Sequence, residues 1–213
     1  MRSRLVLLSS LVAACGGYDS QPLRLIAGGS MTGRALATDA VPLADLEHRL
    51  SDTQPGDVVE TCAAAGPAMQ AISERIAAHG GAAIIIDYGH WRSNGDTFQA
   101  VQNHAYADPF KHPGQADLTA HVDFEALARA APQVKHSALT PQGRLLQALG
   151  IEARAARLAQ SLSGSAQESH LAAYHRLTDA SEMGTLFKAL AFVAPEAPFP
   201  PGFAPFDASQ DEA

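Results

Sequence analysis

An uninterrupted apolar run at residues 82–86, Ala-Ala-Ile-Ile-Ile, restricts the possible folds more than any other segment. A short β-branched run of this kind is typical of a strand that is covered on both faces, as in a parallel sheet. A helical pattern with Met69 and Ile76 on one face precedes it and stops at Gly80-Gly81. We therefore predict an α/β fold. Asp87 follows the strand, and ligands bind beyond the carboxyl ends of such strands.

Composition narrows the class of protein. A chain of 213 residues with 46% hydrophobic residues can bury one core. The formal charge of −7 argues against a nucleic-acid-binding surface, because phosphate binding depends on Lys and Arg. No run approaches the roughly 20 apolar residues of a membrane-spanning helix, so no membrane partner is expected. Cys15, Cys62 and the nine His show no ligand spacing, so we predict no metal site.

The first residues allow two interpretations. Residues 1–14 have a basic start and an apolar run, and Val12-Ala-Ala-Cys15 has the small residues of a lipoprotein cleavage site. Alternatively, residues 5–8 and 23–26 are strands of a β-hairpin that opens a partial domain at an internal start. We favour the strands, because everything downstream looks intracellular. The exported lipoprotein, lipid-anchored through Cys15, stays open.

The rest of the chain suggests three parts: a hairpin and linker over 1–55, a main domain over 56–194 and a flexible acidic tail over 195–213. Residues 58–60 form a brief strand, and residues 90–122 form a long structured loop without a clear period. A final strand covers residues 186–193.

Four helices are expected after this loop. Asp123 should cap the first, through residue 131, with Phe124 and Leu127 buried. The second follows Thr140-Pro141 and the third covers 151–162. The fourth begins with a capping box, Ser165 to Glu168, and runs to about Arg176. The second should bury three leucines: Leu145, Leu146 and Leu149.

One stretch is more distinctive than the others. After Ile-Ile-Ile-Asp87-Tyr88-Gly89 come, in order, Gly95-Asp96-Thr97-Phe98-Gln99-Ala100, His104, Asp108-Pro109, Pro113-Gly114 and Asp117-Leu-Thr119-Ala-His121-Val-Asp123-Phe124. Gln142-Gly143, Leu149-Gly150-Ile151 and Met183-Gly184-x-x-Phe187-Lys188 follow, and Val58-Val-Glu60 precedes. Over residues 56–192 this order resembles the MidA family of class I S-adenosylmethionine-dependent methyltransferases.

The resemblance implies a fold and an activity. The fold is a seven-stranded, mostly parallel Rossmann-like sheet with helices on both faces, and the run that ends at Asp87 would be its fifth strand. The family transfers a methyl group from S-adenosylmethionine to a protein arginine, and its mitochondrial members assist assembly of respiratory complex I. We therefore expect an arginine-containing protein as substrate. The location would be cytoplasmic in a bacterium and mitochondrial in a eukaryote.

This sequence departs from the family where the cofactor is held. The family has a glycine-rich turn after its first strand, an acidic residue after its second and an Asn-Glu-containing turn after its fourth. None of these occurs here, and Gly16-Gly17 and Gly28-Gly29 lack the strand–turn–helix setting. We therefore expect a partial sheet without the N-terminal cofactor-binding half, and cofactor-binding residues that are unknown. Its exposed edge favours self-association or a partner that supplies the missing strands.

Methyl transfer to a guanidinium requires carboxylates that orient and partly deprotonate the arginine. Asp87 is a catalytic candidate, and its alternative is a cap for the turn at Gly89. His121 is the second catalytic candidate, in an acid–base or orienting pair with Asp123, for which the N-cap role is favoured. Glu60 would line the site or end a solvated strand, and we favour the latter. The full set of substrate-binding candidates is Tyr88, Gly89, Gln99, His104, Asp117, Thr119, Asp123 and Glu60.

Three hypotheses follow for the whole chain. It is a truncated MidA-type methyltransferase that acts on a protein arginine. Alternatively, it is a non-catalytic interaction or assembly module that keeps the family's protein-binding loops. The third hypothesis is the exported lipoprotein.

Overall fold

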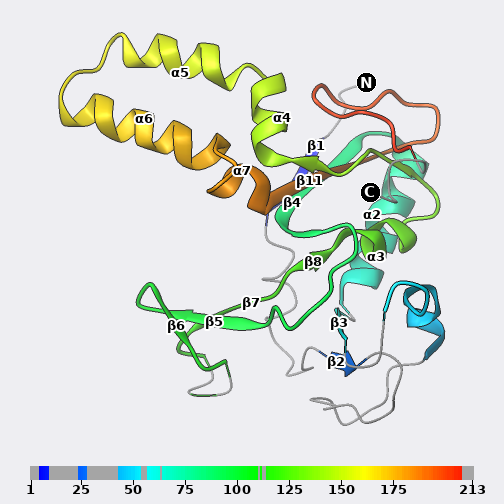
Figure 1. The fold of residues 1–213 in the computed structure, drawn as a ribbon. Helices are drawn as coiled ribbons and strands as arrows, with labels where there is room; N and C mark the ends of the chain where they lie inside the picture. Colours follow the sequence, from blue (N-terminus) through cyan, green and yellow to red (C-terminus); the bar gives the residue numbers. More distant parts are fainter. Residues whose placement is uncertain are drawn as a thin grey trace. The chain divides into compact units, whose positions relative to one another are not determined.

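The computed structural model describes residues 5–9, 24–27, 43–53, 57–62, 64–109, 111 and 114–207. The predictions that concern Cys15, Gly16-Gly17 and Gly28-Gly29 lie outside these residues. The fold is mixed α/β, with a curled sheet and flanking helices (Figure 1). The chain divides into two compact units, the first made of Met1–Ser9, Gln70–Gly89 and Ala131–Ala213, the second of Ser10–Met69 and His90–Ala130. Of the helices that the structure describes, none combines the length and the apolar composition that a membrane span requires.

The sheet of the first unit is built on the predicted apolar strand. This strand, β4 (Ala82–His90), lies between β1 (Leu5–Ser9), which is parallel to it, and β11 (Phe187–Val193), which is antiparallel. On its outer side β11 pairs with β10 (Thr140–Pro141) and β9 (Lys135–His136). All residues from Ala189 to Val193 are buried, so β11 shares the apolar core of β4. The predicted final strand is confirmed.

The predicted β-hairpin at the start of the chain is wrong. Both strands form, but β1 pairs with β4, whereas β2 (Arg24–Ala27) pairs with β3 (Val58–Thr61). Local propensity identified the strands and not their partners, because strand pairing is decided by burial against residues far away in the sequence.

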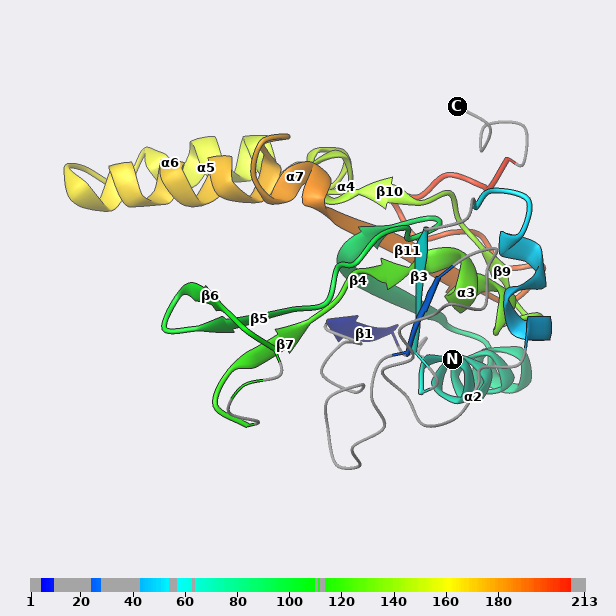
Figure 2. The same ribbon diagram turned by 60° about the horizontal axis from the view of Figure 1, so that its bottom comes forward.

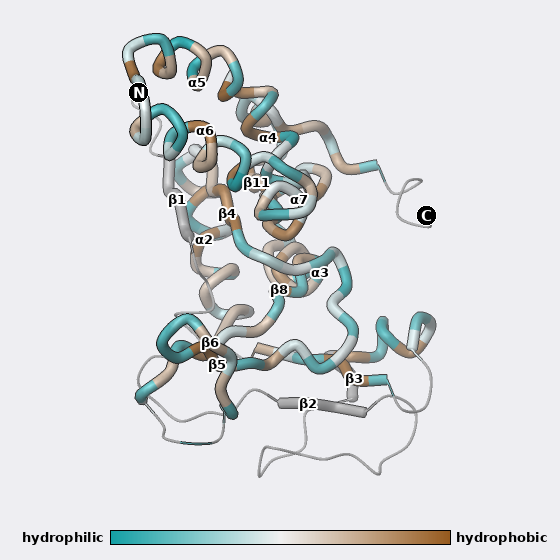
Figure 3. The backbone as a smooth tube through the Cα atoms, turned by 60° about the vertical axis from the view of Figure 1, so that its left-hand side comes forward, coloured by the Kyte–Doolittle hydropathy of each residue, from teal (hydrophilic) through white to brown (hydrophobic). Residues whose placement is uncertain are grey.

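Helices dominate the remainder of the first unit. After α2 (Ala65–His79), the chain forms α4 (Gln142–Ala148), α5 (Ile151–Ala159), α6 (Ser165–Thr178) and the short α7 (Met183–Leu186). Figures 1 and 2 show α5 and α6 side by side and antiparallel. Hydrophilic and hydrophobic residues alternate along both helices (Figure 3), as expected for a helical hairpin that buries one stripe and exposes the other.

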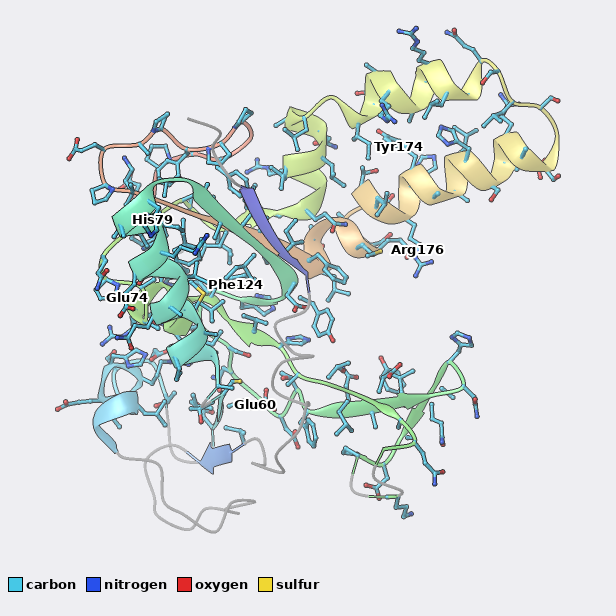
Figure 4. All side chains as sticks on the ribbon, turned by 180° about the vertical axis from the view of Figure 1, so that it is seen from behind. Glu60, Glu74, His79, Phe124, Tyr174 and Arg176 are labelled. Atoms are coloured by element: carbon cyan, nitrogen blue, oxygen red, sulfur yellow. The ribbon has the colours of Figure 1, made fainter. Side chains whose placement is uncertain are left out.

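Two local predictions about these helices are corrected. Gly164 is the N-cap of α6 and makes no side-chain bond, so Ser165 is the first helical residue and no capping box forms. Leu149 is 56% exposed, because α4 has already ended at Ala148, and only Leu145 of the three predicted leucines is fully buried. Tyr174 lies on the side of α6 that faces α5, and Arg176 points away from it (Figure 4).

Two glycines form the junction at the base of the helical hairpin. A Cβ on Gly184 would lie 2.2 Å from the carbonyl oxygen of Thr178, and one on Gly143 would lie 2.5 Å from the same oxygen. The Gly184 amide also donates to the carbonyl of Asp179 (2.9 Å). The side chain of Gln142 donates to the carbonyl of Leu177 (3.0 Å). Gly143 and Gly184, which carried part of the resemblance, therefore permit close approach of α4, α7 and the end of α6.

The predicted flexible tail is packed as far as Phe206. The Ala138 amide donates to the carbonyl of Ala204 (2.9 Å), and the ring of Phe206 lies 4.6 Å from that of His136. The Lys135 ammonium lies 5.3 Å from the centre of the Phe199 ring. The tail was predicted to be flexible from its acidic composition, but its aromatic side chains bury apolar area against the first unit.

The second unit contains the long segment for which the sequence showed no period. Residues 90–122 hold a three-stranded antiparallel sheet, with β5 (Gln99–Gln102) between β6 (Ala105–Ala107) and β7 (Asp117–Thr119). Asn103 and His104 both have positive φ, 52° and 61°, and connect β5 to β6. A two-residue turn of this kind requires left-handed backbone, which Asn adopts more readily than most residues.

The same unit contains β3, the 3-10 helix η1 (Leu43–Arg49), β8 (Val122–Asp123) and α3 (Phe124–Arg129). Phe124 and Leu127 are buried as predicted, although α3 ends two residues earlier than expected. Figure 4 labels Glu60 on β3 and Phe124 at the start of α3.

Candidate functional site

The predicted site residues are divided between the two units. Asp87, Tyr88 and Gly89 belong to the first. The other predicted residues belong to the second: Glu60, Gln99, His104, Asp117, Thr119, His121 and Asp123.

Asp87 lies inside β4 and not after it, because the strand continues to His90. The parallel pairing of β4 with β1 stops at Ile86, so Asp87 is the first residue beyond it. Asp87 is 2% exposed, and its Oδ1 accepts a hydrogen bond from the Tyr88 amide (2.9 Å). Asp87 is therefore not beyond the carboxyl end of β4, as the sequence predicted, but beyond the end of its parallel pairing with β1.

An aromatic pair and a lysine lie close to Asp87 in the first unit. The ring of Tyr88 packs edge-on against that of Phe187, with centroids 5.4 Å apart. Lys188 is the residue of β11 directly opposite Asp87 in the antiparallel register, so both side chains lie on one face of the sheet. Burial lowers the pKa of Lys188, whose ammonium donates to the carbonyl of Thr185. Lys188 was part of the resemblance, but sequence reasoning did not single it out for the site.

In the second unit, Glu60 is buried rather than solvated, which corrects the interpretation favoured from the sequence. It is 6% exposed, and its Oε1 accepts from the amides of Thr97 (3.0 Å) and Phe98 (2.9 Å). Its Oε2 accepts from the Thr97 hydroxyl. Burial raises the pKa of Glu60, and the hydrogen bonds from Thr97 and Phe98 partly oppose this rise.

His121 is connected to Glu60 through Thr97. The hydroxyl oxygen of Thr97 accepts a hydrogen bond from the His121 amide (2.9 Å). The ring of His121 is partly exposed and lies 6.1 Å from the ring of His90, measured between centroids. The structure therefore brings Glu60 and His121, two predicted residues, into one hydrogen-bonded arrangement.

Asp123 is the N-cap of α3, as favoured from the sequence. Its Oδ1 accepts from the Ala126 amide (2.9 Å), and its Oδ2 accepts from Arg49 Nη1 (3.0 Å) and the Ser93 amide (3.2 Å). Burial raises the pKa of Asp123 more than these hydrogen bonds and the charge of Arg49 lower it. Because both carboxylate oxygens of Asp123 accept backbone amides, this side chain holds the start of α3 and the backbone at Ser93 in place.

The ionic network around Asp123 was not predicted from the sequence. Arg49 is 2% exposed and donates to Asp52 from Nε (3.2 and 3.1 Å) and to the carbonyl of Ser93 from Nη2 (3.1 Å). Arg92 forms a two-pronged pair with Glu125 (2.6 and 2.9 Å). The missed signal is the presence of two arginines in segments otherwise rich in turn residues, and their partners are distant in sequence.

We expect the Arg92–Glu125 pair to make stability depend on pH. Burial raises the pKa of Glu125, but the hydrogen bond from Arg92 and the charges of Arg92 and His48 lower it further, so the net pKa lies below the ordinary 4.5. The stabilisation is then complete above about pH 4.5 and is lost as the pH falls through the lower folded value. Urea unfolding should show Glu125→Gln less stable than wild type at pH 6, with the difference shrinking below pH 4.5.

The matched control is Glu196→Gln, which removes an exposed carboxylate from the turn after β11 and should leave stability unchanged at both pH values. A difference between wild type and Glu125→Gln that stays constant down to pH 3 would contradict the assignment.

The remaining candidates lie in the β6-β5-β7 sheet. Gln99 pairs with Thr119, and Asp117 pairs with Val101, on adjacent antiparallel strands. His104 is exposed in the β5–β6 turn. The structure thus brings Gln99 and Thr119 together and places His104 at the other end of β5.

No described group of three or more His, Cys, Asp or Glu is arranged to hold a metal ion. The resemblance implies that the adenosine-containing methyl donor would be held by a glycine-rich turn between a strand and a helix. The described strand-to-helix connections, from β3 to α2, β8 to α3 and β10 to α4, contain no glycine. The described residues do not fit the donor, and no step is derived through it.

A family model and individual relatives all relate this chain to methyltransferases. Residues 30–142 match the family described as "Putative S-adenosyl-L-methionine-dependent methyltransferase". The chain is 37% identical over 147 residues to the mitochondrial protein arginine methyltransferase NDUFAF7 of Xenopus tropicalis, covering 68% of this chain and 34% of that protein. It is 37% identical over 161 residues to human NDUFAF7, covering 74% and 36% respectively. The chain thus spans about a third of the length of these relatives.

Solved structures show the same relationship. A crystal structure of an uncharacterized protein from Burkholderia thailandensis superposes with a TM-score of 0.72 at 26% identity, covering 99% of this chain and 60% of that one. A second structure from the same organism, bound to S-adenosyl-homocysteine, superposes with a TM-score of 0.67 at 26% identity and covers 90% and 54%.

Proposed function

Because this chain belongs to the MidA-type family of S-adenosyl-L-methionine-dependent methyltransferases, we propose that it provides the arginine-handling part of an enzyme that methylates a protein. The observation that carries the proposal is that the family match at residues 30–142 contains the whole polar stretch from Asp87 to Asp123. The relatives named as protein arginine methyltransferases support arginine as the acceptor. S-adenosylmethionine is proposed as the methyl donor, supported by the relative bound to S-adenosyl-homocysteine.

Asp87 is proposed to act on the acceptor. A guanidinium is a poor nucleophile until a carboxylate holds its N–H groups and draws positive charge away from the attacking nitrogen. Asp87 is buried at the point where the parallel pairing with β1 ends, and a carboxylate there binds a cation more strongly than in water. Tyr88 and Gly89 continue the same strand and are proposed to contact the substrate.

His121 is proposed as an acid–base residue for the proton that the attacking nitrogen loses. An imidazole changes charge near neutral pH, which suits it to this work. Its backbone amide donates a hydrogen bond to Thr97, and the residue is partly exposed. Gln99, Thr119, Asp117 and His104 are proposed to bind the substrate polypeptide.

A non-catalytic assembly module is the second candidate. The observation that favours it is that the described strand-to-helix connections contain no glycine turn. In this case the same residues would bind a protein partner and would not catalyse methyl transfer. The two candidates predict different responses to the methyl donor.

The test is calorimetric titration of the purified chain with S-adenosylmethionine, together with transfer of labelled methyl groups to an arginine-containing protein. If the chain catalyses the reaction by itself, the wild type binds the donor and transfers methyl groups, and Asp87→Asn reduces the transfer by about a hundredfold or more. Glu152→Gln on the exposed face of α5 serves as the control and should retain activity. If the titration shows no heat of binding and no methyl transfer at millimolar S-adenosylmethionine, catalysis by this chain is rejected. The non-catalytic assembly module is then the favoured function.

Light scattering on the same samples tests the proposed self-association. Among the described strands, β1 pairs only with β4, so its outer edge offers backbone donors and acceptors to another strand. A monodisperse monomer at micromolar concentration would reject this part of the proposal.

A further inference from the structure

We propose that Glu60 is a positioning residue, which acts through Thr97 to fix the backbone at His121 and at the start of β5, and does not itself contact the acceptor arginine. The inference rests on the proposed function, because it assigns Glu60 a part in that reaction. It replaces the substrate-binding role expected for Glu60 with one that the hydrogen bonds support.

The first support is that both carboxylate oxygens of Glu60 are already occupied. Oε1 accepts two backbone amides, from Thr97 and Phe98, and Oε2 accepts the Thr97 hydroxyl. Glu60 is 6% exposed, so these three hydrogen bonds are shielded from competing water. A guanidinium could reach these oxygens only by breaking buried bonds, each of which is costly to leave unmade.

The second support is the chain of contacts that leads onward. Thr97 donates its hydroxyl hydrogen to Glu60, which leaves the oxygen free to accept the His121 amide at 2.9 Å. The carboxylate therefore sets the direction of the hydroxyl, and the hydroxyl sets the backbone that carries the His121 ring. Hydrogen bonds to a carboxylate are about twice as strong as neutral ones, so this arrangement has one preferred orientation.

The third support is that the segment between β4 and β5 is held at three separate points. At one end, Ser93 is held by Asp123 and Arg49. In the middle, the Gly95 amide donates to the carbonyl of Val58 on β3 (2.8 Å). Glu60 holds the other end, directly before Gln99. These hydrogen bonds involve different acceptors, so the hydrogen bonds to Glu60 can be removed by mutation without removing the other two sets.

The consequence for the reaction is a specific kinetic pattern. A displacement of about 1 Å in an acid–base group can reduce turnover by up to about a hundredfold. Substrate affinity changes much less if Glu60 does not touch the substrate. Loosening the Thr97–His121 bond should therefore lower kcat and leave KM nearly unchanged.

The experiment compares Thr97→Val, which keeps the shape but removes both hydrogen bonds of the hydroxyl, with Thr97→Ser, which keeps them. Amide hydrogen exchange is followed at His121, with the Gly95 amide as an internal control because its acceptor is Val58. In Thr97→Val we expect exchange at His121 to accelerate about tenfold and exchange at Gly95 to stay unchanged. Thr97→Ser should match wild type at both amides.

Methyl transfer is measured on the same variants. We expect kcat of Thr97→Val to fall about tenfold or more with KM nearly unchanged, and Thr97→Ser to restore it. Faster exchange without a change in kcat, or a rise in KM alone, would overturn the positioning role. If Thr97→Val does not fold, Glu60→Gln replaces it, because the glutamine carbonyl still accepts two amides but its amino group cannot accept the Thr97 hydroxyl.

The exchange measurement separates this inference from the proposed function. A wild-type chain without methyl transfer rejects the proposed function, and the exchange at His121 still decides whether Glu60 and Thr97 fix this backbone. Unchanged exchange at His121 in Thr97→Val rejects the inference, whatever the activity.

Discussion

Replacement of Gly184 by alanine is expected to lower the free energy of unfolding by about 3 kcal/mol. The new Cβ would lie 2.2 Å from the carbonyl oxygen of Thr178 and 2.6 Å from that of Asp179. Both neighbours are backbone atoms and cannot rotate away as a side chain can. The start of α7 must therefore move away from the end of α6, which also breaks the bond from the Gly184 amide to Asp179.

Urea unfolding followed by circular dichroism measures this loss. Gly66→Ala is the matched control, because Gly66 lies in α2 and a Cβ there meets nothing within 4 Å. Alanine is the better helix former by about 1 kcal/mol, so this control should be neutral or stabilising. A Gly184→Ala variant within about 0.5 kcal/mol of wild type would show that α6 and α7 are not held in close contact.

Replacement of Arg49 by methionine is expected to cost about 3–5 kcal/mol. The guanidinium is 2% exposed and donates to Asp52, Asp123 and the carbonyl of Ser93. Methionine keeps much of the apolar stem but leaves the Asp123 carboxylate buried without its cation. The pKa of Asp123, already raised by burial, should rise further, because the charge of Arg49 now lowers it.

A double variant tests whether the stability lost in Arg49→Met comes from the unpaired charge of the Asp123 carboxylate. Adding Asp123→Asn to Arg49→Met should recover part of the stability, since an uncharged amide costs less to bury and still accepts the helix-capping bond. Arg144→Met on α4, where the arginine is exposed, should change stability by less than about 0.5 kcal/mol. If Arg49→Met costs no more than this control, the buried network does not stabilise the unit.

Predictions from the sequence succeeded where the information is local. The apolar run of β4 identifies a buried strand because consecutive apolar residues must avoid water on both faces, and Ala83, Ile84 and Ile85 are all buried. Asp123 was predicted as a helix cap because its carboxylate reaches an amide only three residues away. Local composition also misled: Ser165 and Glu168 have capping-box spacing, yet Gly164 occupies the cap position.

Predictions for the candidate site failed where partners are far apart in the chain. Glu60 resembled a solvated strand end, because nothing near it in the sequence shows that residues 97 and 98 will supply three hydrogen bonds. The strands of residues 90–122 were missed because three or four residues are too few to establish a period. Arg49 was missed for the same reason as Glu60, since its partner Asp123 lies 74 residues away.

Local patterns were enough to predict the α/β class, the buried central strand, the capped helix at Asp123 and, by resemblance, the methyltransferase family. The pairing of the strands, the antiparallel position of β11 beside β4, and the hydrogen bonds that link Glu60 to Thr97 and His121 follow from the folded chain alone. The difference lies in the distance along the chain over which each interaction acts. Periodicity and capping act over a few residues, whereas sheet pairing and buried charge are selected by which distant groups can exclude water together.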